Sequence, residues 1–292
     1  MTAGNAASET SARASRHRSA ARRFLRRRSA MTGLVMLSLL FALAFLGPML
    51  SPWNYHTRDF GAFLTPPSTR HWFGTNQTGA DVFSQVLRGT QKSLIMGLLA
   101  AVVATGLAAV VGATGGYLGG WVDRVLSWAV GLLLVLPPFL VLALVSPLLR
   151  GRGWLLFTLL LALFPWLVTS RIVRNTARSL REQEYVTAAR FMGVPPYRII
   201  FRHILPSMAS LLITDATVNV AGVIVAEAAL SYFGFGTQPP DVSLGTLIAD
   251  GSASFLTSPW SFVAPATTLV AIVLSVNLIG DGLRDAFDPL AR

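Results

Sequence analysis

Residues that commonly carry out chemistry are few in this sequence and lie far apart. Cysteine is absent, which excludes disulfides, thiolate metal sites and cysteine nucleophiles. The four histidines are scattered, and no HExxH motif occurs. Lys92 is the only lysine, and although Ser93 follows it, Gly89 is the nearest upstream glycine, so no GxxxxGK phosphate-binding loop exists. We therefore expect no catalytic residues, no metal site, no cofactor in this chain and no ATPase motif. The chain is not predicted to be an enzyme.

A second set of reactive groups lies inside apolar stretches. Carboxylates and amides are costly there unless they face the interior of a helix bundle or water. They are candidates for lining a path through a membrane, although each could instead form a hydrogen bond that only holds two helices together. The candidate path residues are Asp215, Asn219, Glu227 and Asn277.

Three further carboxylates near the C-terminus have helical spacing. Asp281, Asp285 and Asp288 could together bind a cation. A solvated helix end, with Arg284 as their partner, accounts for the same spacing and is the interpretation we favour.

The composition is that of a polytopic membrane protein. Of the 292 residues, 53% are hydrophobic and 13% are charged, and the mean hydropathy is +0.57. A soluble domain carries about 25% charged residues. Apolar stretches of spanning length, about 20 residues, recur along the chain. We expect an all-α fold with six membrane spans, at residues 31–50, 93–118, 125–145, 154–173, 207–229 and 260–279.

Glycines and prolines refine two of these spans. Gly112, Gly116 and Gly120 recur every four residues, which predicts a helix face that a neighbouring helix can approach closely. Pro137 and Pro138 should bend or break the third span.

Segments between the spans divide the chain into parts. The eight arginines before residue 31 resemble the start of a signal peptide or a transit peptide, but the leading segment is too long and the apolar run reaches spanning length, so we favour an uncleaved first helix. A short interfacial helix is expected over 81–87. The expected parts are a basic tail (1–30), the first transmembrane helix (31–50), an extracytoplasmic loop (51–92), a core (93–283) with a cytoplasmic loop (174–206), and a C-terminal tail (284–292).

Basic residues predict the orientation. With the N-terminus in the cytoplasm, 18 of the 24 lysines and arginines fall on the cytoplasmic side and 6 on the other. The net charge of +11 is therefore an orientation signal and does not argue for nucleic acid. Arg171, Arg174, Arg178 and Arg181 share one helical face, which fits contact with lipid headgroups better than contact with an acidic partner.

The longest polar interruption of the apolar sequence is the coupling stretch, residues 184–206. Ala188 and Ala189, followed by Gly193, give a helix face with little side-chain bulk, which a partner could approach closely. Gly193 and the prolines at 195 and 196 should end this helix. We interpret it as a docking helix for a soluble partner; an ordinary capped helix in a loop is the alternative.

The coupling stretch resembles the EAA loop of binding-protein-dependent ABC importer permeases, where an Ala pair, a Gly four residues on and a downstream Leu-Pro recur. Thr187 stands where that motif has Glu, Glu184 lies one turn earlier, and His203 replaces an apolar residue. The block AEAALSYFGFGTQPPDVSLGTLIADG and the later NLIGDGLRDAFDP are similar to the C-type permeases of peptide importers, and with HWFGTNQTGAD the resemblance covers most of the chain. Asn76, Ala80 and Leu244 depart from that pattern.

The resemblance implies a type I importer permease (MetI-like) fold and a bacterial inner-membrane location, with both termini cytoplasmic. It also implies that the chain is part of a peptide importer. The expected partners are a B-type permease, two ATPase subunits that bind ATP and Mg, an extracytoplasmic peptide-binding protein and the membrane lipid that surrounds the complex. Residues expected to couple to the ATPase are Glu184, Thr187, Ala188, Ala189, Gly193, Leu205 and Pro206.

Other functions remain open at this point. Related permeases carry nickel or other small solutes. An ion-coupled secondary transporter would need no ATPase, but it usually has more spans and internal repeats, which are not found here. A structural or sensory membrane protein would leave the docking helix unexplained.

Overall fold

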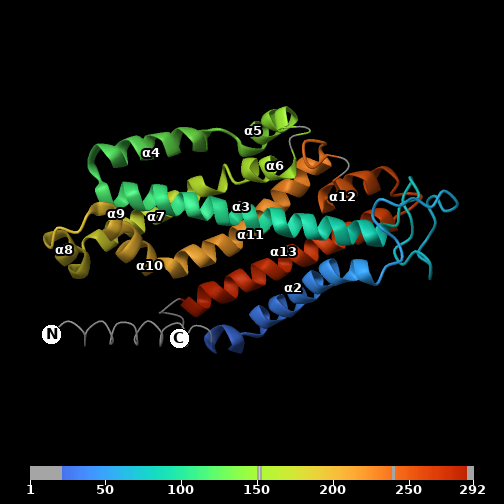
Figure 1. Cartoon of the computed structure of the whole chain (residues 1–292), viewed down its shortest axis with the longest axis horizontal. Coiled ribbons are helices and arrows are strands. Elements are labelled where there is room, and N and C mark those ends of the chain that lie inside the picture. The colour runs from blue at the N-terminus through green and yellow to red at the C-terminus, as the bar shows by residue number, and fades with distance from the viewer. Residues whose placement is uncertain (1–21, 150, 152, 239–240, 288–292) are drawn as a thin grey trace.

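The chain folds as a bundle of long helices. The computed structural model describes residues 22–149, 151, 153–238 and 241–287; most of the expected tail 1–30, and Asp288, lie outside them. Within these ranges the regular structure is helical, apart from two isolated β-bridges. Figure 1 shows the long helices lying along one axis, with short helices at both ends. The expected all-α fold is confirmed.

Four helices are long and apolar enough to cross a membrane without a break. They are α2 (Arg28–Leu46, continued by the turn η1 at Gly47–Met49), α3 (Val82–Leu118), α11 (Ala209–Tyr232) and α13 (Trp260–Phe287). Two further helix pairs are bent: α4 (Gly120–Val135) meets α5 (Pro138–Val145) and the turn η2 (Ser146–Leu149) at 81°, and α6 (Trp154–Leu161) meets α7 (Pro165–Arg181) at 43°. The described chain thus has four spans, or the expected six when each bent pair is one span.

Proline explains both bends. Pro137 and Pro138 interrupt the third span as expected, with Leu136 and Pro137 in extended conformation between α4 and α5. Pro165 begins α7, where its missing N–H costs no helical hydrogen bond. We did not expect this second break.

The start of α3 and the end of α13 differ from the sequence-based expectation. The Asp81 carboxylate accepts a hydrogen bond from the Ser84 amide (2.8 Å) and so caps α3, which begins at Val82 rather than at residue 93. The interfacial helix expected over 81–87 is therefore wrong as a separate element, because it is the first part of α3. The expected boundary at 92 falls inside this helix. At the other end of the chain α13 continues to Phe287, past the expected end at 279.

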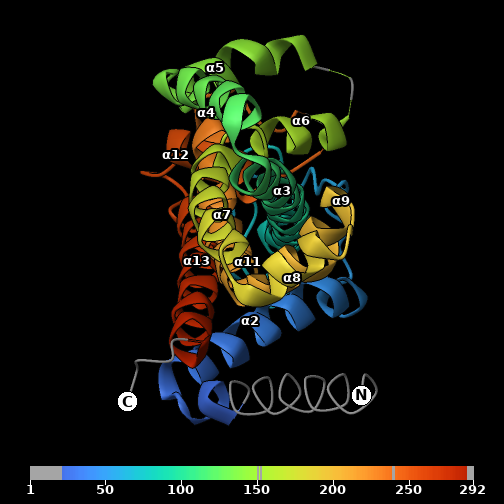
Figure 2. The same ribbon diagram turned by 90° about the vertical axis from the view of Figure 1, so that its left-hand side faces the viewer.

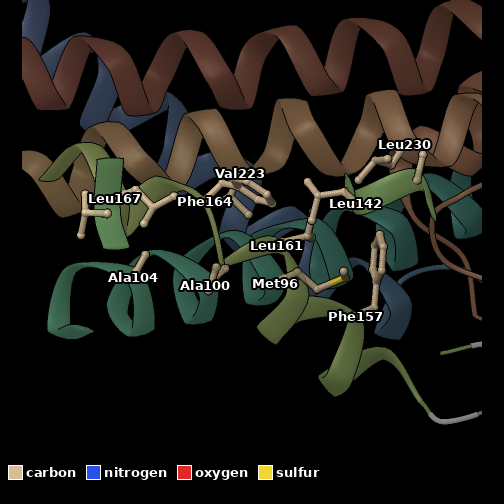
Figure 3. Packing of buried hydrophobic residues seen from close by; sticks show 13 residues of the cluster. Met96, Ala100, Ala104, Leu142, Phe157, Leu161, Phe164, Leu167, Val223 and Leu230 are labelled. Atoms are coloured by element: carbon tan, nitrogen blue, oxygen red, sulfur yellow. The ribbon is translucent and has the colours of Figure 1, made fainter. Parts of the chain in front are cut away.

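Helix α3 is the centre of the bundle. Figure 2, an end view, shows it with α4 and α5 on one edge and α2 on the opposite edge. Its side chains Met96, Ala100 and Ala104 lie in one buried cluster with Leu161 of α6 and Val223 of α11, as Figure 3 shows. Because Ala occupies so little volume, the neighbouring helices come close to α3 along much of its length.

The closest approach to α3 is made by α7. A Cβ atom added to Gly112 would lie 2.5 Å from the Ser170 carbonyl oxygen, and one added to Gly116 would collide with the Arg174 carbonyl oxygen. The glycine face expected from the sequence is confirmed for these two residues. It is wrong for Gly120, which begins α4 and where an added Cβ atom would have nothing within 4 Å.

Substituting Gly112 by Ala should lower the thermal midpoint of the purified protein in detergent, because the added methyl group cannot be placed without separating α3 from α7. We expect a loss of about 1–3 kcal/mol, as for other overpacked sites. Gly106→Ala is the matched control on the same helix, since nothing lies within 4 Å of its added Cβ. Equal midpoints for the two variants would contradict this account of the contact.

Candidate functional site

The coupling stretch forms a compact unit at one end of the bundle. It contains α8 (Glu184–Phe191), α9 (Pro196–Ile199), a π-helical turn η3 (Ile200–Ile204) and α10 (Leu205–Ser207). Figure 1 shows α8 beyond the ends of α3 and α7. Pro206 lies two residues after the end of the π turn, and its missing N–H and its ring prevent regular α-helical bonding to the preceding turn.

Helix α8 ends as expected from its sequence. Gly193 has φ of 76°, the left-handed conformation that glycine adopts most easily. The Val194 amide donates to the Ala189 carbonyl (3.2 Å), and the Gly193 amide donates to the Arg190 carbonyl (3.1 Å). This pair of bonds is a Schellman motif. The stop predicted at Gly193 is confirmed.

The two faces of α8 differ from the expected small-residue surface. Val186 and Ala189 are buried and pack with Val173 of α7 and with Ile199 and Ile204. Ala189 therefore contacts this chain's own core and is not open to a partner. The expected contact surface therefore loses Ala189. The expected coupling residues that are exposed are Glu184, Thr187, Ala188, Gly193 and, on α10, Pro206, whereas Leu205 is half-buried.

Two apolar side chains on the outward side of α8 were missed by the sequence analysis. Phe191 is 88% exposed and Met192 is 75% exposed, although both are large and apolar. Hydrophobic exposure of this kind, on a helix beyond the ends of the spanning helices, is typical of a protein-binding surface. In the sequence, their place at the C-terminal end of a short helix with a defined stop could have indicated that they are exposed.

A hydrogen-bond chain attaches α8 to α10. The Tyr185 hydroxyl lies 3.2 Å from the Ser207 hydroxyl, which donates to the His203 carbonyl (2.6 Å). With the buried Val186 and Ala189, these contacts fix the orientation of α8 relative to the spanning helices.

Asp215 and Asn219 come together in a second polar group, the Asp215 cluster. The Asp215 carboxylate oxygen Oδ2 accepts hydrogen bonds from Thr169 of α7 (2.8 Å), Asn219 (2.8 Å) and Thr105 of α3 (3.5 Å). The cluster therefore ties α11 to both α3 and α7. Asp215 and Asn219 are both half-buried.

Glu227 lies apart from that cluster and is almost fully buried. Its carboxylate oxygen Oε1 accepts from the hydroxyls of Ser231 (2.6 Å) and Thr237 (3.1 Å), and its exposed fraction is 1%. Thr237 belongs to the segment between α11 and α12 (Leu244–Ala253). In the same region Lys92 of α3 pairs with Asp241 (3.0 Å). Both contacts hold this segment against the bundle.

The fourth candidate path residue, Asn277, is exposed on α13 and is not brought together with the other three. More than two turns further along α13, Asp285 pairs with Arg27 of the N-terminal segment. The expected pairing of the C-terminal carboxylates with Arg284 is therefore wrong for Asp285, because the start of α2 packs beside α13.

A cavity of about 830 Å³ is lined by the loop before α3 and by the segment around α12. It lies at the end of the bundle opposite α8, between the segment 55–85 and the segment 231–261. Arg58, Gln85 and Asp250 are among its polar lining residues.

Glu227→Ala should destabilise the protein by about 1–3 kcal/mol, because it leaves two buried hydroxyls without their acceptor. Glu227→Gln keeps an oxygen at Oε1 and should stay close to the wild-type midpoint. Thermal unfolding in detergent measures both, with the exposed Glu182→Ala as control. A glutamine variant as unstable as the alanine variant would show that the charge itself is required.

Comparison with known proteins identifies the family. Residues 104–292 match the model of the binding-protein-dependent transport system inner membrane component, and residues 15–67 match the N-terminal transmembrane domain of oligopeptide transport permease C. The chain is 54% identical over 280 residues to the oligopeptide transport system permease protein OppC of Mycobacterium tuberculosis H37Rv, covering 96% of both proteins. It is 38% identical to a putative peptide permease protein of Brucella suis (93% of this chain, 90% of the relative) and 35% identical to OppC of Haemophilus influenzae (94% and 88%). The chain therefore belongs to the family of binding-protein-dependent transport system inner membrane components.

Proposed function

We propose that this chain is the C-type membrane-spanning subunit of an ATP-driven importer of oligopeptides or dipeptides. The observation that carries the proposal is the 54% identity to an oligopeptide transport system permease protein over 96% of the chain. That similarity includes the coupling stretch, and the exposed apolar side chains of α8 suit a helix that docks on another subunit.

In this proposal the subunit works inside a complex. A second, B-type permease forms the translocation path with it, two ATPase subunits bind on the α8 side, and a peptide-binding protein delivers substrate on the other side. ATP and Mg are bound by the ATPase subunits, because this chain has no GxxxxGK loop. Closure of the ATPase pair moves α8 and switches the access of the path from one side to the other.

In this proposal the coupling residues fall into two groups, one on the outward surface that binds the ATPase and one that packs against this chain's own helices. Glu184, Thr187, Ala188 and Gly193 form the outward surface together with Phe191. Ala189 acts through the core cluster that it shares with Val173 of α7, and Leu205 packs against the same cluster. Pro206 is exposed in the first turn of α10. A load on the outward surface therefore passes directly into α7.

The α8 end is proposed to lie in the cytoplasm. The excess of lysine and arginine in the segments that meet at this end supports the orientation. Both termini then lie in the cytoplasm of a bacterial cell, and the 830 Å³ cavity opens on the extracytoplasmic side.

Asp215, Asn219, Glu227 and Asn277 remain candidate path residues. Among them Glu227 has the least suitable position, because a path residue must reach water or substrate and Glu227 is 1% exposed. Asp215 and Asn219 are half-buried and Asn277 is exposed, so these three meet that condition.

Phe191→Asp should abolish co-purification of the ATPase subunits while leaving membrane insertion intact, because a charged side chain would replace an apolar contact at the centre of the docking surface. Affinity purification of the whole complex from detergent, followed by immunoblotting or mass spectrometry, measures it. Leu256→Asp is the matched control, since Leu256 is 96% exposed at the opposite end of the bundle. Normal ATPase recovery with Phe191→Asp would count against docking through α8. A charged residue at Ala189 would be a poorer test, since it would disrupt this chain's own core.

Single cysteines can test the orientation, because the natural chain has none. Ser179→Cys, at the exposed end of α7, should react with a membrane-impermeant maleimide only in inside-out vesicles. Leu256→Cys should react in intact spheroplasts. The opposite pattern would show that the α8 end lies outside the cell.

A further inference from the structure

Arg171 is exposed and lines an open cavity between α3, α4 and α7. The cavity has a volume of about 250 Å³, and its walls include Gly115, Ser127, Ser170, Arg171, Arg174 and Asn175. The Nη2 atom of Arg171 would be 3.6 Å from a Cβ atom added to Gly131 of α4, so the absence of a side chain there leaves room for the guanidinium. Within the described ranges no carboxylate forms an ion pair with Arg171.

The next arginine on the same face of α7 is different. Arg174 donates to both carboxylate oxygens of Asp123 on α4, with Nη2 2.6 Å from Oδ2. Its charge is therefore neutralised within the chain. The cavity holds one paired and one unpaired guanidinium, and its net charge is positive.

The unpaired charge lies inside the membrane-spanning part of the bundle. Gly112 of α3 packs against Ser170 and Val173, so Arg171 is level with Gly112. Gly112 is about 9 Å of helix from the end of α3 at Leu118, within the uncharged stretch that follows Lys92. Side chains on a helix lean toward its N-terminus, and the guanidinium of Arg171 indeed lies beside Gly131, away from the α8 end. A charge at this depth requires water or an anion.

We propose that Arg171 binds the C-terminal carboxylate of the transported peptide inside the translocation path. This inference rests on the proposed peptide-import function. The terminal carboxylate is an anionic group that every unmodified linear peptide carries, whatever its sequence. A guanidinium can bind it through two parallel N–H···O bonds. The cavity is smaller than the roughly 300–1,000 Å³ of a pocket for a drug-sized ligand, which fits the end of a peptide rather than a whole one.

The hydroxyls of Ser127 and Ser170 and the amide of Asn175 line the same cavity. The Ser170 hydroxyl already donates to the Leu167 carbonyl (2.8 Å) and the Ser127 hydroxyl to Asp123 (3.4 Å), so both oxygens are left as acceptors for a peptide N–H. The Asn175 amide can both donate to and accept from a peptide backbone, and none of these groups reads side chains. Such a site suits a path that must pass many different peptides, because it recognises only what they share.

Two other anions could neutralise Arg171, a phospholipid phosphate and a carboxylate of the second permease. Neither depends on the end group of the cargo. The end group of the peptide is therefore the variable that separates the proposal from both of them.

The experiment compares one peptide as its free acid and as its C-terminal amide. The whole complex, with its ATPase subunits and binding protein, is reconstituted in proteoliposomes, and ATP-dependent uptake is measured with the binding protein saturated by each peptide. Wild type should favour the free acid. Arg171→Gln should lower uptake of the free acid by about tenfold or more, the factor that corresponds to losing a hydrogen bond to a charged group, and should leave uptake of the amide unchanged. Arg124→Gln, which removes an exposed arginine of α4 outside the cavity, should keep the wild-type ratio.

Equal loss of both peptides in Arg171→Gln would overturn the inference and assign Arg171 to lipid or to the second permease. An unchanged acid-to-amide ratio with normal uptake would overturn it as well. If Arg171→Gln fails to assemble, Arg171→Lys decides: we expect a several-fold lower ratio, because an ammonium lacks the two-pronged geometry, and a wild-type ratio would contradict bidentate binding. Absence of uptake of either peptide by the wild-type complex would overturn the proposed function, and this inference with it.

Discussion

Neutralising charge within apolar surroundings is the constraint on which the rest of this structure depends. Lipid offers no partner for a carboxylate or a guanidinium, so the chain must supply one itself or expose the group to water. Asp123 and Arg174 join α4 to α7 in this way, and Lys92 and Asp241 join α3 to the segment before α12. Each pair connects elements that are distant in sequence. The ion pairs therefore help to decide which helices become neighbours.

Hydroxyl groups perform the same task for the carboxylates that have no basic partner. Asp215 receives its hydrogen bonds from threonine and asparagine side chains, and Glu227 receives its own from Ser231 and Thr237. Both carboxylates lie on α11. Helix α11 is consequently anchored at two positions along its length. Asp215 ties it to α3 and α7, and Glu227 ties it to the segment that follows it. Arg171 is the contrasting case, since the described chain gives it no such partner.

Much of this fold could be predicted from local sequence, because its causes are local. Hydropathy predicts the spans, Pro137 and Pro138 predict a break, and Gly193 predicts the end of α8. The faces of α8 could not be predicted, because the residues that cover Ala189 are Ile199 and Ile204, whose position depends on the turn between them. By hydropathy alone, Phe191 would be placed inside rather than 88% exposed.

Long-range partners were likewise beyond the sequence analysis. The arginines of α7 share one helical face, which is visible from their spacing, yet Arg174 has a carboxylate partner and Arg171 has none. Whether an arginine of α7 has a partner depends on where α4 lies. The break at Gly119 and Gly120 and the contact between α4 and α7 set the position of α4. The assignment of Asp215 and Asn219 to a path, which the sequence suggested, remains a prediction.

Helix α7 connects the features that bear on function. Its first turns carry Thr169, which binds Asp215, and Arg171, which lies in the cavity; its later turns carry Val173 and Ala177, which pack in the same core as Ala189 of α8. No proline or glycine interrupts it between Pro165 and Arg181, so its 17 residues form a rod of about 26 Å. A displacement of α8 by a docked subunit therefore cannot be absorbed inside α7. It must move the cavity and the Asp215 cluster together, and the bend before Pro165 is the nearest place where that motion can be taken up.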